Sequence, residues 1–230
     1  MTIQEAIDQL DTEFQEAPLG FTVETALQSR LLELLRTKIG ETIQVRGGYN
    51  TDDATGYKQK YLNRIATPQS ISNIQPEVNF GLSGKKNRSL DIAILEPQHD
   101  SEYDDLDYLP AGDTPSVTVR LVDGSKYFSA ASIKHAIELK YIKNVDVAGA
   151  KFECDNIDEW SHFSADLAKL GDLSDAESRH LIVVSNKNPF QQGEVDGRST
   201  AKAQRRYERV EMECEKRGVT LTEIHPRSEE

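Results

Sequence analysis

Three charged residues, Asp91, Glu138 and Lys140, stand inside segments that otherwise read as apolar strands. Asp91 belongs to residues 90–95, whose sequence is LDIAIL, and the other two belong to residues 136–141, AIELKY. Because successive side chains of a strand point to opposite faces, Glu138 and Lys140 share one face. A buried charge is costly unless it is paired or bound to a metal. A structural ion pair explains most single Glu-x-Lys sequences, so an ion pair and a metal site are the alternatives.

The same alternation predicts the faces of the first strand. Asp91 shares its face with Ala93, whereas Leu90, Ile92 and Ile94 are expected to face the opposite way. Each of the two strands therefore has one apolar face and one face on which charged groups lie among hydrophobic neighbours.

The elements that must position these residues follow from hydrophobic periodicity and from turn residues. The predicted helices cover residues 3–14, 22–38, 158–171 and 199–217, and the predicted strands cover residues 77–80, 90–95, 136–141, 180–185 and 219–224. An additional hairpin is predicted over 116–129, around Asp123-Gly124. The stretch 47–70 has no predicted element, 81–89 reads as a hairpin turn, and 96–115 reads as an acidic loop.

Capping residues set the expected ends of the helices. Thr22 is the predicted N-cap of the second helix and Gly40 its stop. Asp158 is the predicted N-cap of the third helix, whose apolar stripe consists of Trp160, Phe163, Leu167 and Leu170 and whose stop is Gly171. Lys169 lies opposite Trp160 and is predicted to be a surface residue. Gly218 is expected to end the last long helix.

The order helix, three strands, helix, strand predicts an α/β fold in layers. We expect one domain over residues 1–230, with a core at about 22–186, an inserted loop and hairpin at 96–130, and a helix and strand appended at 199–224.

Composition narrows the class of protein. A hydrophobic share of 37%, a charged share of 29% and the absence of a long apolar run predict a soluble protein without a membrane span. The N-terminus lacks the features of a secretory signal, which favours the cytoplasm. Cys154 and Cys214 are far apart and have no CxxC spacing, so a zinc site is not expected. The net charge of −12 argues against a protein that coats nucleic acid non-specifically.

Together, these segments resemble the PD-(D/E)xK nuclease superfamily, which has the restriction-endonuclease-like fold. The resemblance spans about residues 22–186 and rests on LDIAIL, AIELKYI, the helix DEWSHFSADLAKL and the strand HLIVVSN. It is a likeness of fold and of a short, degenerate motif. The proline of the family's name has no counterpart, since Leu90 precedes Asp91, but many members of the superfamily lack it. The resemblance implies a three-layer core with a mixed central sheet flanked by helices.

The resemblance also implies a metal centre. Asp91 and Glu138 would bind Mg²⁺, with the main-chain carbonyl of Leu139 as a third ligand and Mn²⁺ as a substitute metal. Mg²⁺ prefers oxygen ligands and retains several of its waters, so two carboxylates and one carbonyl are enough protein ligands. Lys140 would orient or deprotonate the attacking water, and partial desolvation near a cation would lower its pKa.

Members of the superfamily often add a glutamate from the first core helix, and helix geometry separates two candidates. Glu24 lies about 20° from both Leu31 and Leu35 and so faces the core, whereas Glu33 lies on the solvated side. Glu24 is therefore the predicted fourth site residue, although a favourable carboxylate in the first helical turn is an equally good explanation. Glu77 on the first strand is a weaker candidate.

The function implied is metal-dependent phosphodiester hydrolysis by a DNA endonuclease of a restriction or defence type, with DNA as substrate and protein partners or a homodimer as further expectations. One alternative is a catalytically silent module of the same fold that binds nucleic acid or protein. A second alternative is an ordinary α/β protein with a structural ion pair. Two groups of basic residues are candidates to grip a nucleic-acid backbone, namely Lys85, Lys86 and Arg88, and Lys202, Arg205, Arg206 and Arg209; glutamates dilute the second group.

Overall fold

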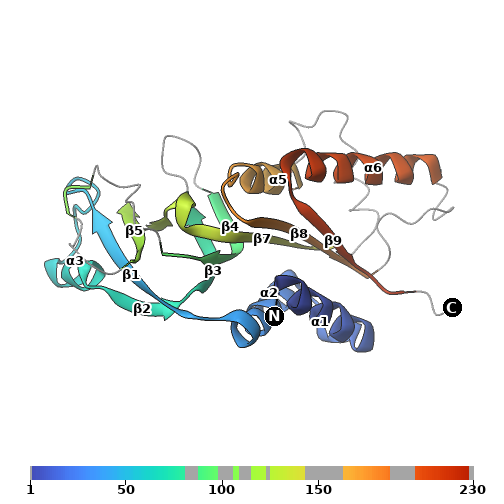
Figure 1. Cartoon of the computed structure of the whole chain (residues 1–230), viewed down its shortest axis with the longest axis horizontal. Helices are drawn as coiled ribbons and strands as arrows, with labels where there is room; N and C mark the ends of the chain where they lie inside the picture. Colours follow the sequence, from blue (N-terminus) through green and yellow to red (C-terminus); the bar gives the residue numbers. More distant parts are fainter. Residues whose placement is uncertain are drawn as a thin grey trace.

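One continuous mixed sheet runs along the long axis of the molecule, with helices on both of its faces (Figure 1). The computed structural model describes residues 2–80, 88–97, 106–108, 115–122, 125–142, 163–186 and 200–227. Within this part of the chain, nine strands follow one another across the sheet in the order β2-β1-β5-β6-β3-β4-β7-β8-β9.

The helices and strands have the following bounds. The strands are β1 (Thr42–Tyr49), β2 (Gln69–Ser72), β3 (Ile74–Phe80), β4 (Arg88–Leu95), β5 (Val117–Val122), β6 (Ser125–Phe128), β7 (Ile133–Ile142), β8 (Ser178–Ser185) and β9 (Thr220–Ile224). The helices are α1 (Ile3–Glu16), α2 (Glu24–Ile39), α3 (Gln59–Ala66), α5 (Phe163–Gly171) and α6 (Thr200–Arg217), with short 3₁₀ turns η1 (Pro18–Gly20) and η2 (Ala130–Ser132).

The predicted α/β fold with a mixed sheet flanked by helices is confirmed, but the number and order of the strands differ from the prediction. β1, α3 and β2 lie within residues 42–72, where no element was predicted, and α3 lies entirely within the stretch 47–70. Two glycines interrupt the apolar alternation of β1, and α3 is only eight residues long, so neither element gives a strong periodic signal. The hairpin predicted over 116–129 forms as β5 and β6, but it joins the main sheet between β1 and β3.

The two faces of the sheet carry separate hydrophobic clusters. α1 and α2 cover one face, where Phe14 and Leu31 belong to the same buried cluster as Ile137 of β7. α5 and α6 cover the other face, where Phe163 belongs to a cluster with Leu181 of β8. Each such side chain, when fully buried, contributes about 1.5–3 kcal/mol to stability. β4, β7 and β8 supply apolar side chains to both clusters, which explains why all three strands contain runs of apolar residues in the sequence.

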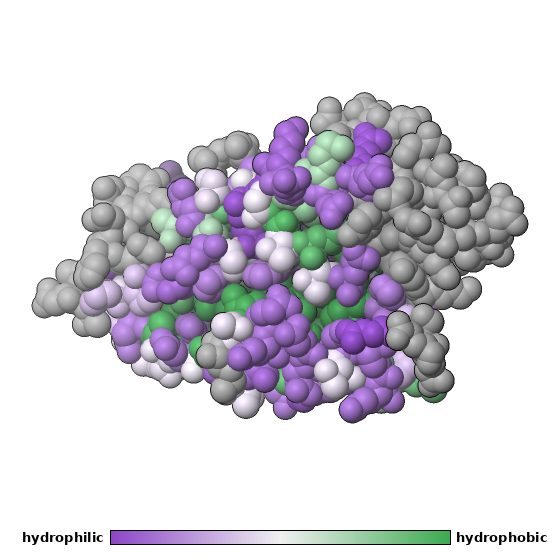
Figure 2. All heavy atoms as spheres, turned by 45° about the vertical axis from the view of Figure 1, so that its right-hand side comes forward, coloured by the Kyte–Doolittle hydropathy of each residue, from purple (hydrophilic) through white to green (hydrophobic). Residues whose placement is uncertain are grey.

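The surface in Figure 2 is mostly hydrophilic over the described residues, with hydrophobic residues visible only in narrow seams. No helix in the described ranges is both long and apolar enough to cross a membrane.

The start of α2 corrects one predicted cap. The helix begins at Glu24, and Val23, in extended backbone and without a side-chain capping bond, occupies the position expected for Thr22. The 3₁₀ turn η1 precedes this segment, and the side chain of Glu24 accepts a hydrogen bond from Tyr141 of β7, so tertiary contacts set the helix start. Gly40 ends the helix as predicted.

The later helices end where glycine predicts. α5 ends at Gly171, and Gly218, with a φ of 63°, follows the last residue of α6. The predicted cap Asp158 and the stripe residue Trp160 lie outside the described residues.

β4 departs from strict alternation at Asp91. Ile92 faces the α1–α2 cluster and Ala93 the α5–α6 cluster, as predicted, but Leu90 lies in the same cluster as Ala93, contrary to the prediction. The position of β3 that would face Asp91 is Glu77, whose φ of 50° is left-handed and whose pairing is missing from the β3–β4 register. The β3–β4 register is the same on both sides of Glu77, so no residue is inserted. The distorted position lies where the alternation of β4 is interrupted, and hydrophobic periodicity does not reveal it.

Gly47 lets α3 lie directly against β1, and this contact is testable. A Cβ on Gly47 would overlap Cγ2 of Ile65 and come within 2.9 Å of the carbonyl oxygen of the same residue, so Gly47→Ala must displace the helix. We expect a loss of about 1–3 kcal/mol in the free energy of unfolding, measured by urea denaturation. Gly20→Ala is the matched control, because a Cβ there meets nothing within 4 Å. Equal stability of the two variants would contradict the close packing of α3.

Candidate functional site

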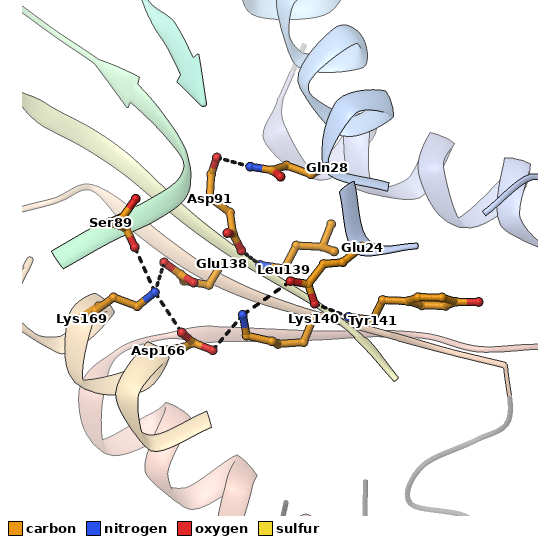
Figure 3. A network of polar contacts seen from close by, with 10 residues as sticks. All are labelled: Glu24, Gln28, Ser89, Asp91, Glu138, Leu139, Lys140, Tyr141, Asp166 and Lys169. Atoms are coloured by element: carbon orange, nitrogen blue, oxygen red, sulfur yellow. Dashed lines mark hydrogen bonds and ion pairs between the residues drawn. The ribbon is translucent and has the colours of Figure 1, made fainter. Parts of the chain in front are cut away.

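The antiparallel pairing of β4 and β7 brings the predicted site residues together (Figure 3). Ile92 pairs with Ile137, so the next position along the ladder sets Asp91 opposite Glu138. The main-chain N–H of Leu139 donates to Oδ2 of Asp91 at 2.7 Å, which fixes the carboxylate against β7. The two predicted metal-binding carboxylates therefore come from neighbouring strands of the sheet.

Glu138 has the most demanding position in the cluster. Its side chain has no exposed surface, and its Oε1 lies 2.8 Å from Nζ of Lys169. Its Oε2 is buried and has no hydrogen-bond partner among the described residues. Burial, followed by the nearby charge of Asp91, raises the pKa of Glu138 well above its usual 4.5. A buried carboxylate oxygen without a donor is therefore directed into this cluster.

The pKa of Asp91 is also raised, but less than that of Glu138. Desolvation raises the pKa of Asp91, while the Leu139 N–H and the charges of Lys140 and Lys169 act in the opposite direction. The backbone at this position is held from the other face of the sheet, because the side-chain amide of Gln28 on α2 donates to the Asp91 carbonyl at 2.8 Å. Gln28 lies one helical turn after Glu24 and is not among the site residues predicted from the sequence.

Lys140 extends from β7 toward two carboxylates. Its Nζ lies 3.2 Å from Oδ2 of Asp166 and 3.9 Å from Oε1 of Glu24. Burial lowers the pKa of Lys140, but the combined charges of four carboxylates, Asp166 foremost, outweigh burial and raise it. The predicted lowering concerns Lys140 beside a bound cation and stays a prediction; in the protein without a cation, the negative charge of the cluster raises the pKa of Lys140.

α5 contributes two residues that sequence analysis did not assign to the site. Asp166 is 6% exposed and lies between the two lysines, and Lys169 contacts both Asp166, at 2.9 Å, and Glu138. The prediction that Lys169 is a surface residue is wrong. It lies about 100° from Leu170 on the helix, and its long side chain reaches around to the sheet, where Nζ also donates to the Ser89 carbonyl. A signal for Asp166 was present, since it lies within about 60° of Phe163 and Leu170 on the apolar stripe.

The structure separates the candidate glutamates. Glu24 extends from the first turn of α2 to the end of β7, where its Oε2 accepts from the Tyr141 N–H at 2.9 Å and its other oxygen faces Lys140. Its side chain is 43% exposed, so it lies at the border of the cluster with solvent. Glu33 is exposed and pairs with Arg30. Glu77 is exposed and lies on the distorted part of β3.

The charges within the cluster do not balance. If all groups were ionised, two ammonium groups, of Lys140 and Lys169, would face four carboxylates, of Glu24, Asp91, Glu138 and Asp166. Two negative charges would then remain unbalanced. The raised pKa values of Asp91 and Glu138 show that the ionised forms of these two carboxyl groups are the ones disfavoured. A divalent cation would neutralise this excess.

The predicted metal ligands fit this excess of charge. In the described ranges, no group of three or more His, Cys, Asp or Glu side chains is arranged to hold a metal ion. The predicted donors are two side chains, Asp91 and Glu138, and one main-chain carbonyl. The N–H and C=O of a strand residue point to the same side, so the Leu139 carbonyl is directed toward β4, beside Asp91. The buried Oε2 of Glu138 is the strongest sign that the cluster accepts a further positive group.

The other predicted basic contacts lie apart from this cluster or outside the described residues. Arg88 pairs with Asp172 at 2.7 Å. Lys85 and Lys86, and the side chains of Lys202, Arg205 and Arg206, lie outside the described part of the chain. Cys214 is buried and its thiol is free, and Cys154 is outside the described residues.

Comparison of the chain with protein-family models, with curated proteins and with solved structures finds no match in any of the three.

The raised pKa of Glu138 predicts how stability changes with pH in EDTA. The folded carboxyl binds a proton more readily than the unfolded one, so its contribution to stability falls as pH rises from about 4.5 through the folded pKa. Glu138→Gln should lose less stability than the wild type over this window, so the gap between their unfolding curves should widen with pH. Glu33→Gln, exposed and on the far side of α2, should follow the wild type. If the difference in unfolding free energy between Glu138→Gln and the wild type did not change with pH, the raised pKa assigned to Glu138 would be wrong.

Proposed function

We propose that this chain is a Mg²⁺-dependent endonuclease with a PD-(D/E)xK site and DNA as its substrate. The observation that carries the proposal is the fully buried carboxylate of Glu138, whose Oε2 has no hydrogen-bond partner among the described residues and which lies opposite Asp91. A carboxylate pair in this state, with Lys140 two residues along the same strand face, suits a site that binds a hard cation next to a base.

The arrangement of the central elements supports the same proposal. Six elements, α2, β3, β4, β7, α5 and β8, occur along the chain in the order helix, three strands, helix, strand, which is the order expected for a restriction-endonuclease-like core. Other elements are inserted between α2 and β3 and between β4 and β7. β3, β4 and β7 are antiparallel neighbours, and β8 is parallel to β7. β1, β2, β5, β6 and α3 would then be additions to one edge of this core.

The chemistry of the proposed site follows from its donors. Asp91, Glu138 and the Leu139 carbonyl would hold the Mg²⁺, and Mn²⁺ would substitute for it. When bound, the metal supplies charge neutralisation for the scissile phosphate and acidifies a water molecule. Lys169 keeps one oxygen of Glu138 engaged, which leaves the other to face the metal position.

Lys140 would act on the attacking water. Its ammonium group is held between Asp166 and Glu24, so its position is fixed on both sides. The carboxylates that raise its pKa include Asp91 and Glu138. Neutralising these two with a cation removes part of that effect, so metal binding would favour the neutral, basic form of the amine. Until then Lys140 stays protonated and compensates the carboxylates.

A silent binding module of the same fold is the second candidate. The observation that favours it is the pairing of Asp166 and Glu138 with two lysines, an arrangement that also suits a purely structural network. Such a module would gain no thermal stability from Mg²⁺ or Mn²⁺, whereas a site that binds the metal gains stability by mass action.

Lys140→Ala should abolish metal-dependent DNA cleavage because it removes the group that acts on the water. The assay follows nicking of supercoiled plasmid with Mg²⁺ and with EDTA. Lys216→Ala is the control, since Lys216 is 71% exposed on α6. The Mn²⁺-induced rise in melting temperature should persist in Lys140→Ala, and DNA binding measured in Ca²⁺ should persist too, so that lost cleavage reports chemistry. Undiminished cleavage by Lys140→Ala would exclude this mechanism.

The two helix glutamates should differ in the same assay. Glu24→Gln removes a carboxylate that faces Lys140 and Tyr141, so the rate of cleavage should fall substantially, by about tenfold or more, the equivalent of about 1.4 kcal/mol. Glu33→Gln removes only an exposed ion pair with Arg30, worth about 0–1 kcal/mol of stability, and should leave the rate unchanged. Equal rates for both variants would limit the site to Asp91, Glu138 and Lys140.

A further inference from the structure

The sequence of one region is depleted of acidic residues. Asp and Glu make up 39 of 230 residues, about one in six, yet residues 54–76 contain none. Extended to residue 90, the region holds six Lys or Arg against the single acid Glu77, a formal charge of +5 within a chain of −12. The segregation is informative because carboxylates elsewhere on this protein repel polyanions, so a polyanion would be directed to this region.

The structure places part of this region on an exposed helix. α3 packs Leu62 and Ile65 toward the sheet, and Lys58, Lys60 and Arg64 lie on its exposed side. No carboxylate of the described residues forms an ion pair with these three cations. By contrast, the two lysines of the candidate site, Lys140 and Lys169, are both paired with carboxylates. Their charges therefore remain available to a ligand.

Aromatic rings adjoin these cations. Tyr57 and Tyr61 stack with ring centroids 5.6 Å apart and planes inclined by 13°, and Tyr61 is 40% exposed. Tyr57 packs inward against the same small cluster as Tyr49, whose ring stacks on Tyr108. The ring of Tyr61 is thus supported from behind by Tyr57, and its exposure leaves ring surface open to a stacking partner.

We propose that the exposed side of α3 is a nucleic-acid contact surface, with Lys58, Lys60 and Arg64 on phosphates and Tyr61 stacking on a base. Unpaired cations next to a supported, exposed aromatic ring suit a polyanion that also carries flat bases. An acidic protein segment would use the cations but has no counterpart for the ring. The inference rests on the proposed function only in taking the bound strand to be the substrate.

The position of α3 sets how far a bound strand must extend. α3 lies on β1, at the opposite end of the sheet from α5 (Figure 1). Three strands, β5, β6 and β3, separate β1 from β4, which carries Asp91. At about 4.8 Å per strand this is about 19 Å, or about six nucleotides at about 3.4 Å each. A DNA strand that contacts both Asp91 and α3 should therefore lose the part of its binding affinity that comes from α3 when it is shorter than about six nucleotides.

The test measures binding without cleavage. Fluorescence anisotropy of labelled single-stranded and duplex 30-mers is recorded in EDTA for the wild type and for Lys60→Glu/Arg64→Glu. We expect at least a tenfold loss of affinity and a salt-dependence slope smaller by about 1.4 for single strands or about 1.8 for duplex DNA. The control Lys216→Glu/Arg227→Glu makes the same change of net charge at two residues, each 71% exposed, that lie far from α3 in the sheet order, and should change little.

The aromatic contribution has its own pair of variants. Tyr61→Ala should weaken single-stranded DNA binding by about 5- to 150-fold without altering the salt slope, whereas Tyr61→Phe should bind like the wild type because it keeps the ring. Circular dichroism and melting curves check that each variant is folded. Equal losses in the two charge-reversal variants would overturn the proposal. Poly-glutamate binding as tight as DNA binding, together with no effect of Tyr61→Ala, would overturn it in favour of an acidic protein partner.

The outcomes separate this inference from the proposed function. Binding that depends on α3 in a protein that never cleaves DNA with Mg²⁺ supports the surface and contradicts the endonuclease. Metal-dependent cleavage that is unaffected by the α3 variants, with unchanged binding, contradicts the surface and leaves the endonuclease standing.

Discussion

Glu138 keeps a carboxylate inside the central sheet with no exposed surface, and the elements around it are arranged to make this tolerable. A buried charge without a partner would cost several kcal/mol, so a cation must reach it from an adjacent layer. Lys169 does so from α5 and simultaneously holds Asp166, which in turn holds Lys140. The packing of α5 on the sheet therefore depends on this network as well as on its apolar stripe.

The network joins both layers of helices through β7. From the α2 side, Glu24 accepts from the Tyr141 N–H and Gln28 donates to the Asp91 carbonyl, so the C-terminal end of β7 and the middle of β4 are held in place. From the α5 side, Asp166 and Lys169 hold the charged side chains themselves. A site held from both faces of a sheet is more rigid than one on a loop, which suits chemistry that requires fixed geometry. The remaining negative charge is what makes the network incomplete without a cation.

The edge of the sheet formed by β2, β1, β5 and β6 has a different role from the centre. It carries α3, the close contact at Gly47 and stacked tyrosines, and its elements α3 and β2 come from the acid-poor part of the sequence, residues 54–76. Separation of charge along one sheet lets a protein with an overall charge of −12 present a locally positive surface to a polyanion. The carboxylates at the centre would then meet a phosphate only where a metal compensates them.

Local patterns in the sequence determined much of the central fold. Apolar runs predicted β4, β7 and β8, helical periodicity predicted α1, α2 and α5, and alternation placed Glu138 and Lys140 on one face, because these signals depend only on neighbouring residues. Only the tertiary structure decided that β1 and β2 extend the sheet and that Lys169 reaches Glu138. It also decided that Leu90 packs in the same cluster as Ala93, on the α5–α6 face. It also decided the direction of the Lys140 pKa shift, since that depends on four carboxylates drawn from α2, β4, β7 and α5. Pairing partners, a distorted β3 and the reach of a long side chain are set by contacts between segments far apart in the chain, and no local pattern encodes them.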